Sequence, residues 1–210
     1  MNLPIDIHTH HLLTVDGAKC ILNRTPEDFT PEEGCWYSVG VHPWHLNKKA
    51  LDKLYLAASC PQVVAIGETG FDKLASASMP LQMEFFEYHA CLAEKLKKPL
   101  IIHMVRSLDD VLLLKKRIKP KMPWIIHGFR GKPLVAYQLL QHDFYLSYGE
   151  KYNEESLRIT SPERLFLETD EARISIETLY VRAAEIRGIS VEELSQIIQA
   201  NVKKVFFTHE

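Results

Sequence analysis

Eight short apolar runs, which alternate with longer amphipathic stretches, restrict the fold of this chain more than any other feature. The runs cover residues 3–7, 19–22, 36–41, 63–67, 99–103, 123–127, 144–147 and 165–168. They lack the period-two polarity of a strand with one solvated face, so we expect parallel strands that are covered on both faces. Helical patterns lie at residues 80–97, 108–118, 132–140 and 176–187. Gly188 marks the end of the last of these, and Ser190 followed by Glu193 marks the capped start of another helix.

The alternation predicts an α/β fold, a TIM-type (β/α)8 barrel that forms a single domain of residues 1–210. A chain of 210 residues is short for this fold. Only residues 8–18 separate the first two runs, so we expect a distorted barrel whose first helix is missing or reduced to a turn. A flavodoxin-like open sheet is the alternative.

The composition argues against several classes of protein. No stretch approaches the roughly 18 apolar residues of a membrane span, and the first residues lack the basic and apolar regions of a secretory signal. The four cysteines show no C-x-x-C spacing and indicate free thiols in a reducing compartment. We therefore expect a cytoplasmic protein without membrane contact, and nothing implies an obligate protein partner. The net charge of −2 indicates that a nucleic-acid substrate would be held locally.

Polar residues interrupt the apolar runs where the predicted strands end. His8 and His10 follow the first strand at positions i and i+2, so their side chains point to the same side and can share one metal ion. Two histidines at the entry to a loop are weak evidence by themselves. The other strand ends add His42, Glu68, His103, His127 and Asp170.

These strand ends are expected to meet at one rim, because active sites of barrels lie at the carboxyl ends of the strands. Charged groups at the end of an apolar run are costly without partners. Divalent cations are the best shared partners for six of these residues, since their ligands are neutral imidazoles and ionised carboxylates. The six are His8, His10, His103, His127, Glu68 and Asp170. Six ligands exceed what one tetrahedral ion takes, so two ions bridged by a carboxylate fit better.

Six motifs occur in order along nearly the whole chain. They are DIHTH (6–10), GVHPW (40–44), AIGETGFD (65–72), PLIIH (99–103), IIHGF (125–129) and LFLETD (165–170). Together with the C-terminal stretch 187–206, these motifs resemble the TatD family of metal-dependent deoxyribonucleases. The resemblance implies a TIM-like barrel, two divalent ions (Zn, Mn or Mg) and hydrolysis of phosphodiester bonds. The expected substrate is DNA, cleaved as by a 3′-5′ exonuclease, or a small phosphodiester.

The resemblance also assigns roles to single residues around the first ion. His8 and His10 would bind this ion, and Asp170 would complete the site and face the attacking water. Asp170 is then the general base, or a simple ligand with no role in proton transfer. His42 would contact a phosphate oxygen or protonate the leaving oxygen, unless it only supports a neighbouring ligand.

The second ion would be bound by His103 and His127. Glu68 would bridge the two ions and so take part in catalysis. The histidines and carboxylates at these six ligand positions match the pattern of the family.

The substrate-binding loops depart from that pattern. Leu12 replaces an acid that follows the second histidine in the family, Lys73 stands at an aromatic position, and Glu171 replaces a proline. Arg130, Arg106 and Lys73 are the candidates for phosphate contact. A solvated loop charge is the alternative for both arginines.

Three other interpretations remain open at this point. A phosphoesterase of the PHP type also begins with D-x-H-x-H and would differ in the number of strands. An amidohydrolase that cleaves a C–N or carboxylic ester bond usually carries a bridging lysine, whereas Glu68 is the bridging candidate here. A non-catalytic metal-binding barrel would be expected to have lost ligands, and all six are present.

Overall fold

The computed structural model describes residues 4–11 and 19–207, and the apolar runs of the sequence form its strands. The strands are β1 (Ile5–Thr9), β2 (Lys19–Arg24), β3 (Trp36–Val39), β4 (Val63–Asp72), β5 (Leu100–Val105), β6 (Trp124–Ile126), β7 (Phe144–Tyr148) and β8 (Leu165–Leu167). They form one eight-stranded sheet in the order of the sequence. The parallel pairing that the sequence predicts is confirmed for β1–β2, β3–β4, β4–β5 and β7–β8.

Helices follow most of the strands. They are α1 (Lys48–Ala58), α2 (Met79–Leu96), α3 (Leu108–Ile118), α4 (Pro133–Gln141), α5 (Glu154–Ile159), α6 (Ile176–Arg187) and α7 (Val191–Phe206), with a 3-10 turn at Pro162–Arg164. Ser190 caps α7 as predicted, since its Oγ accepts a hydrogen bond from Glu193 N at 3.1 Å. The prediction of a missing first helix falls largely on residues 12–18, as does Leu12, and lies outside the described residues. None of the helices described is long and apolar enough to cross a membrane.

The sequence analysis predicts neither α1 nor α5. The buried stripe of α1 consists of three alanines beside Leu54, so its apolar periodicity is faint. The six residues of α5 are too few for a periodic pattern. Both helices begin at an asparagine cap, because the side chains of Asn47 and Asn153 accept backbone hydrogen bonds from the first turns. These caps are the signal that could have revealed the two helices.

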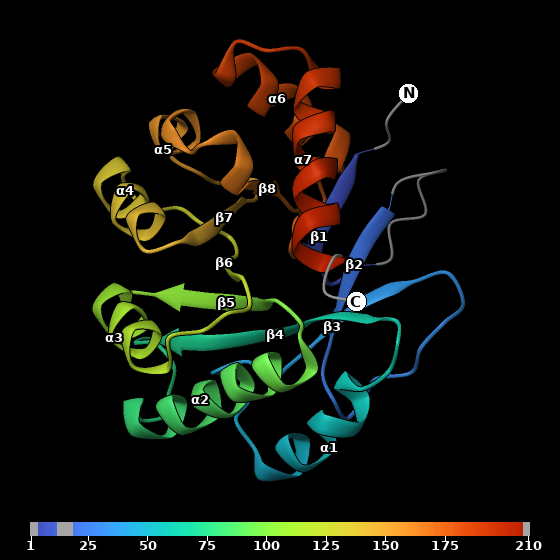
Figure 1. The fold of residues 1–210 in the computed structure, drawn as a ribbon, viewed down its shortest axis with the longest axis vertical. Helices are drawn as coiled ribbons and strands as arrows, with labels where there is room; N and C mark the ends of the chain where they lie inside the picture. Colours follow the sequence, from blue (N-terminus) through green and yellow to red (C-terminus); the bar gives the residue numbers. More distant parts are fainter. Residues whose placement is uncertain (1–3, 12–18, 208–210) are drawn as a thin grey trace. The chain divides into compact units, whose positions relative to one another are not determined.

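The chain divides into two compact units. The first unit contains the described residues 4–11, 19–22 and 126–207, and the second contains residues 23–125. In the first unit α7 lies beside β1 (Figure 1), and the rings of Phe166 in β8 and Phe206 in α7 have centroids 5.7 Å apart. In the second unit α2 lies along β4 (Figure 1), and the ring of Phe86 in α2 packs against Phe71 in β4 at 5.0 Å. The single-domain organisation stays a prediction.

The fourth strand is longer than the sequence predicts, since β4 runs to Asp72 and does not end at Gly67. Two glycines let it lie close against β5. A Cβ at Gly67 (φ +129°) would lie 2.4 Å from a carbonyl oxygen of β5, and one at Gly70 (φ +148°) would lie 2.0 Å from His103 O. Only glycine fits at such distances. The close pairing continues past Glu68, so this carboxylate belongs to the strand itself.

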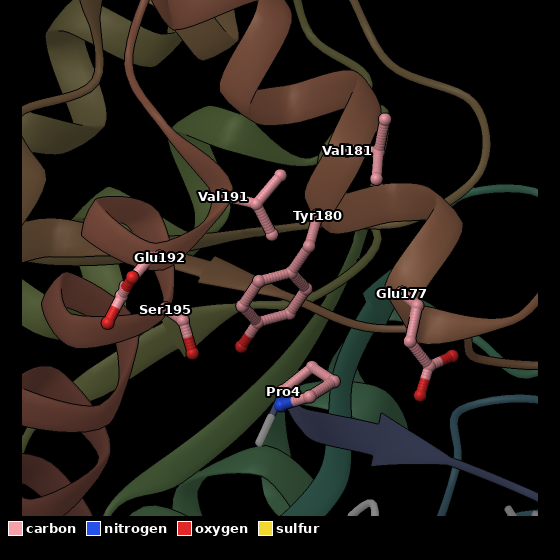
Figure 2. Close-up of a pocket in the computed structure, with 7 residues that line it drawn as sticks. All are labelled: Pro4, Glu177, Tyr180, Val181, Val191, Glu192 and Ser195. Carbon is pink, nitrogen blue, oxygen red and sulfur yellow. The ribbon is translucent and has the colours of Figure 1, made fainter. Parts of the chain in front are cut away.

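A mainly apolar cavity of about 280 Å³ opens beside α6 and α7 in the first unit. The residues that line it are Pro4, Glu177, Tyr180, Val181, Val191, Glu192 and Ser195. The ring of Tyr180 extends from α6 into this space (Figure 2), and its hydroxyl donates to Ile5 O at 3.0 Å. None of the site residues predicted from the sequence lines this cavity.

Candidate metal centre

The backbone of Asp170 joins the end of β1 to the residues that follow β8. Asp170 N donates to His8 O at 2.9 Å, and His10 N donates to Asp170 O at 3.1 Å. This pairing places Asp170 Oδ1 3.8 Å from His8 Nε2 and 3.6 Å from His10 Nε2. The φ of Asp170 is +55°, in the left-handed region that aspartate tolerates better than most residues. The three predicted ligands of the first ion therefore form one cluster, with one donor atom of each within 4.8 Å of the others.

A buried carboxylate, Asp6, holds the backbone around this cluster. Its Oδ1 accepts hydrogen bonds from His8 N at 3.2 Å and Thr169 N at 3.1 Å, and its Oδ2 accepts from Thr169 Oγ1 at 2.6 Å. Burial raises the pKa of Asp6 to about 7, although the hydrogen bonds from Thr169 and His8 oppose the rise. Asp6 thus fixes the residues next to two candidate ligands. Asp6 belongs to the DIHTH motif, but the sequence predicts no role for it.

His127 lies in a second group of donors in the same unit, together with Glu168 and Asp170. Glu168 Oε1 lies 3.1 Å from His127 Nδ1 and accepts a hydrogen bond from Gly128 N at 2.6 Å. Burial acts to raise the pKa of Glu168, but the nearby His127 and His8 outweigh it and hold that pKa below its ordinary value. The sequence analysis does not select Glu168. Its place two residues before Asp170, at the end of an apolar run, was the available signal.

The second unit contains a cluster of Glu68, His103 and His42. Glu68 Oε1 lies 2.9 Å from His103 Nδ1 and 3.4 Å from His42 Nε2, and the two imidazole nitrogens lie 3.3 Å apart. The side chain of Glu68 is almost completely buried, and its backbone N donates to Asn23 Oδ1 at 2.9 Å. The peptide bond that precedes Glu68 is cis. The structure therefore brings together three of the predicted site residues: Glu68 within β4, His103 within β5 and His42 just after β3.

Asp72 orients one of these histidines. Its Oδ2 lies 2.9 Å from His103 Nε2 and accepts a hydrogen bond from Trp44 Nε1 at 2.6 Å, while its Oδ1 accepts from Leu74 N at 2.8 Å. Burial acts to raise the pKa of Asp72, but the hydrogen bonds from His103, Trp44 and Leu74 N lower it below its ordinary value. His103 Nε2 then donates to Asp72 and leaves Nδ1 to face Glu68. Carboxylates that orient a ligand histidine in this way are common around metal sites.

His89 of α2 supports the turn that carries His42. It is fully buried, its Nε2 accepts a hydrogen bond from Val41 N at 3.0 Å, and its Nδ1 lies 2.7 Å from Phe85 O. One nitrogen accepts and the other donates, so this environment requires the neutral ring. Burial accordingly lowers the pKa of His89 to about 4, even though the hydrogen bond to Phe85 O opposes the shift.

The three predicted substrate contacts occupy exposed positions near the ends of strands. Arg130 lies in the first unit after β6, and Arg106 lies in the second unit directly after β5. Lys73 follows β4, and its Nζ forms an ion pair with Asp110 Oδ2 at 2.8 Å. The structure therefore gives Lys73 an acidic partner of its own, which reduces the charge that it offers to a phosphate.

The donors in both units suit divalent ions. They combine imidazole nitrogens and carboxylate oxygens, the mixture that Zn and Mn accept in proteins. Neither Glu168 Oε2 nor the hydroxyl of Ser147 beside it has a hydrogen bond of good geometry among the described residues. Buried polar atoms normally have a partner. A divalent ion would give the buried oxygen of Glu168 a partner, so the residues present fit a metal centre.

The model of the TatD related DNase family matches residues 13–207. The chain belongs to the TatD family. The TatD relatives include an uncharacterised metal-dependent hydrolase of Buchnera aphidicola, which is 31% identical over 188 residues that cover 80% of this chain and 70% of the relative.

Two further TatD proteins bear on function and on fold. The 3′-5′ ssDNA/RNA exonuclease TatD of Klebsiella pneumoniae is 32% identical over 170 residues, and the match covers 74% of this chain and 64% of the exonuclease. The solved structure of YJJV, a TatD homologue of Escherichia coli K12, matches with a TM-score of 0.82 at 20% identity and covers 97% of both chains. This likeness confirms the TIM-type barrel and excludes the flavodoxin-like sheet.

The prediction of a TatD-family metal-dependent hydrolase is confirmed by the family match and the relatives. The amidohydrolase interpretation is not favoured, and β4, which carries Glu68, contains no lysine. The ligand roles of single residues, the bridging role of Glu68 and the proton transfers assigned to Asp170 and His42 stay predictions. The number and identity of the metal ions stay predictions as well.

Proposed function

We propose that this TatD protein is a nuclease that removes nucleotides from the 3′ end of single-stranded DNA with the help of two divalent ions. The observation that supports this most directly is the convergence of His8, His10 and Asp170 in a chain of a metal-dependent hydrolase family. The Klebsiella relative is a 3′-5′ exonuclease on ssDNA and RNA. DNA, RNA and small phosphodiesters share the phosphoryl group that such a centre would recognise.

The roles of the residues follow from their positions. Divalent ions bound here would activate a water molecule near neutral pH and neutralise charge on the phosphoryl oxygens. Asp170 Oδ1 lies beside the imidazoles of His8 and His10, so Asp170 would orient the water and accept its proton. His42, whose Nε2 lies 3.4 Å from Glu68 Oε1, would protonate the leaving oxygen. Glu68 would bridge the ions.

The protein would contact the nucleic-acid backbone at only a few phosphates. The net charge of −2 provides no broad basic face, and Lys73 already pairs with Asp110. Arg130 is then the first candidate for a phosphate contact, followed by Arg106. Each phosphate contact adds roughly 0.7 to the log–log salt slope on single strands, so we propose a shallow salt dependence of KM.

The test is cleavage of one single-stranded DNA labelled at its 5′ end or at its 3′ end. The protein is stripped of metal and reloaded with Zn, Mn or Mg, and RNA of the same sequence is compared. The expected result is stepwise shortening from the 3′ end with at least one metal, and none with metal-free protein. The proposal fails if no metal supports phosphodiester cleavage while an amide or carboxylic ester is turned over.

We also propose that the protein acts in the cytoplasm, without membrane contact or an obligate protein partner. None of the four cysteines forms a disulfide bond, as in proteins of reducing compartments. Fractionation of the cells that express the protein tests this location directly.

A further inference from the structure

An exposed tryptophan stands beside the cluster of the second unit. Trp44 directly follows His42-Pro43, and 54% of its surface is exposed. Large aromatic side chains are usually far more buried than this, and they are enriched where proteins bind other molecules. The exposed indole of Trp44 is therefore available to contact a ligand.

Two hydrogen bonds to neighbouring residues fix the position of Trp44. Its Nε1 donates to the buried Asp72 Oδ2 at 2.6 Å, and the backbone N of Trp44 donates to His42 Nδ1 at 3.1 Å. The only polar atom of the side chain is thus used in a hydrogen bond to a buried carboxylate, so a ligand would meet the carbon atoms of the ring. A rigid apolar ring of this kind loses little conformational entropy when a flat partner stacks on it.

The same hydrogen bonds place the ring next to the candidate ligands. Asp72 Oδ2 contacts both Trp44 Nε1 and His103 Nε2, at 2.6 and 2.9 Å. Asp72 itself is fixed by α2, because Gln82 Oε1 accepts from Asp72 N at 2.8 Å and Gln82 Nε2 donates to Asp72 O at 3.0 Å. A group stacked on Trp44 would therefore lie close to His103, which contacts Glu68 Oε1 at 2.9 Å.

We propose that Trp44 is a stacking platform for a nucleobase of the substrate, next to the bond that is cleaved. This inference rests on the proposed nuclease function. Proteins that bind single strands without sequence preference combine cationic contacts with aromatic side chains on which bases stack. Of the three candidate phosphate contacts, Lys73 already pairs with Asp110, so stacking would supply affinity beyond that of Arg130 and Arg106. Every base has a flat face, so the platform favours a base over no base and discriminates little among the four.

The experiment compares two single strands that differ only in the terminal base. One is a short fluorescent oligodeoxythymidylate whose terminal linkage is a slowly hydrolysed phosphorothioate, and the other has an abasic residue at its 3′ end. Binding to the metal-loaded full-length protein is measured by anisotropy, and metal content is measured in parallel. The wild type is expected to bind the strand with the base about tenfold more tightly, as one stacked base contributes.

Two substitutions separate stacking from support of Asp72. Trp44→Leu removes the aromatic face and the N–H, so the preference for the base should fall below about twofold. Trp44→Phe removes the N–H but keeps an aromatic face, so it should keep most of the preference. Tyr55→Leu is the matched control, since Tyr55 of α1 is also an exposed aromatic (45%) in the same unit and has no described contact with the cluster. It should keep the full preference.

Three results would overturn the proposal. Trp44→Leu could keep a tenfold preference for the base, or Trp44→Phe could lose as much preference as Trp44→Leu. The wild type could also cleave DNA while binding both strands equally, and then the platform fails but the nuclease function stands. If the wild type neither binds nor cleaves either strand, the proposed function and the platform fail together.

Discussion

At the scale of the residue, Asp170 combines an unusual backbone conformation with a central position among candidate ligands. Its φ of +55° is one that asparagine also adopts readily, so Asp170→Asn should fold with an unchanged melting temperature. The substitution removes the negative charge beside His8 and His10 and the ability to accept a proton. We expect kcat to fall at least about 100-fold. Rates between pH 6 and 9 provide the measurement, and an unchanged kcat across that range would assign the base to another residue.

Glu168 is one of the buried carboxylates for which the sequence predicted no role. The substitution Glu168→Gln keeps the size of the side chain and can keep the hydrogen bond from Gly128 N, but it removes the charge beside His127. Residues that orient or charge-balance ligands typically change metal affinity by about 10- to 100-fold, and we expect a loss in that range. Competition with a chromogenic chelator measures the affinity. Glu171→Gln, at an exposed position three residues further on, should leave it unchanged. Equal affinities for Glu168→Gln and the wild type would remove Glu168 from the centre.

At the scale of the element, His89 links helix α2 to the end of strand β3. Its pKa in the folded protein is about 4, against 6.5 for an ordinary histidine, because the site is buried and suits only the neutral ring. Below pH 6.5 the unfolded chain therefore takes up a proton that the folded protein excludes. The free energy of unfolding falls as the pH decreases from 6.5 to 4, and above 6.5 the effect is absent.

Replacing this histidine should flatten that pH dependence. The loss over the full window is on the order of 3 kcal/mol for the wild type, and His89→Gln should remove most of it. The variant should also be less stable at pH 8, because a well-fitted buried group has been lost. Urea unfolding at pH 8, 6 and 4.5 measures both effects. His142→Gln, at an exposed position, is the control and should follow the wild type. If His89→Gln also follows the wild type, the ring is not held neutral.

The close approach of β4 to β5 depends on the glycine at position 70. A Cβ at Gly70 would lie 2.0 Å from His103 O, so Gly70→Ala must push apart the strands that carry Glu68 and His103. We expect a loss of more than about 2 kcal/mol in the free energy of unfolding, together with weaker metal binding. Gly188→Ala is the control, since a Cβ there meets nothing within 4 Å and only the positive φ is unfavourable, at a cost of about 1 kcal/mol. Similar losses for the two variants would mean that the strands adjust easily.

At the scale of the whole molecule, the sequence predicts the sheet better than the groups around the candidate centre. Buried parallel strands produce continuous apolar runs, so β1 to β8 can be recognised one by one. The long helices produce a periodic stripe, whereas α1 buries small alanines and α5 is short, so neither stands out. The predicted end of β4 lies too early in the chain, because glycines such as Gly67 and Gly70 are typical of turns. In the structure these two glycines allow β4 to lie close to β5.

The candidate ligands could be predicted from the sequence for a similar reason, whereas the groups that support them could not. His8, His10 and His103 end apolar runs, where an unpartnered polar residue is conspicuous. Asp72 becomes significant only when its position beside His103 Nε2 and Trp44 Nε1 is known. Such contacts join residues distant in the chain, and no spacing rule predicts them.

The number of metal ions is a property of the whole chain, because the predicted ligands come from both units. We predict two divalent ions per chain after saturation at neutral pH, measured by metal analysis of the purified protein. His10→Ala removes a predicted ligand of the first ion, and His103→Ala removes a predicted ligand of the second ion, so each variant should bind about one ion. Glu68→Gln distinguishes a bridge from a simple ligand. A bridging carboxylate balances two like charges across a short gap, so its loss should weaken both ions, whereas loss of a simple ligand should weaken one. A wild type that binds less than one ion would contradict the prediction outright.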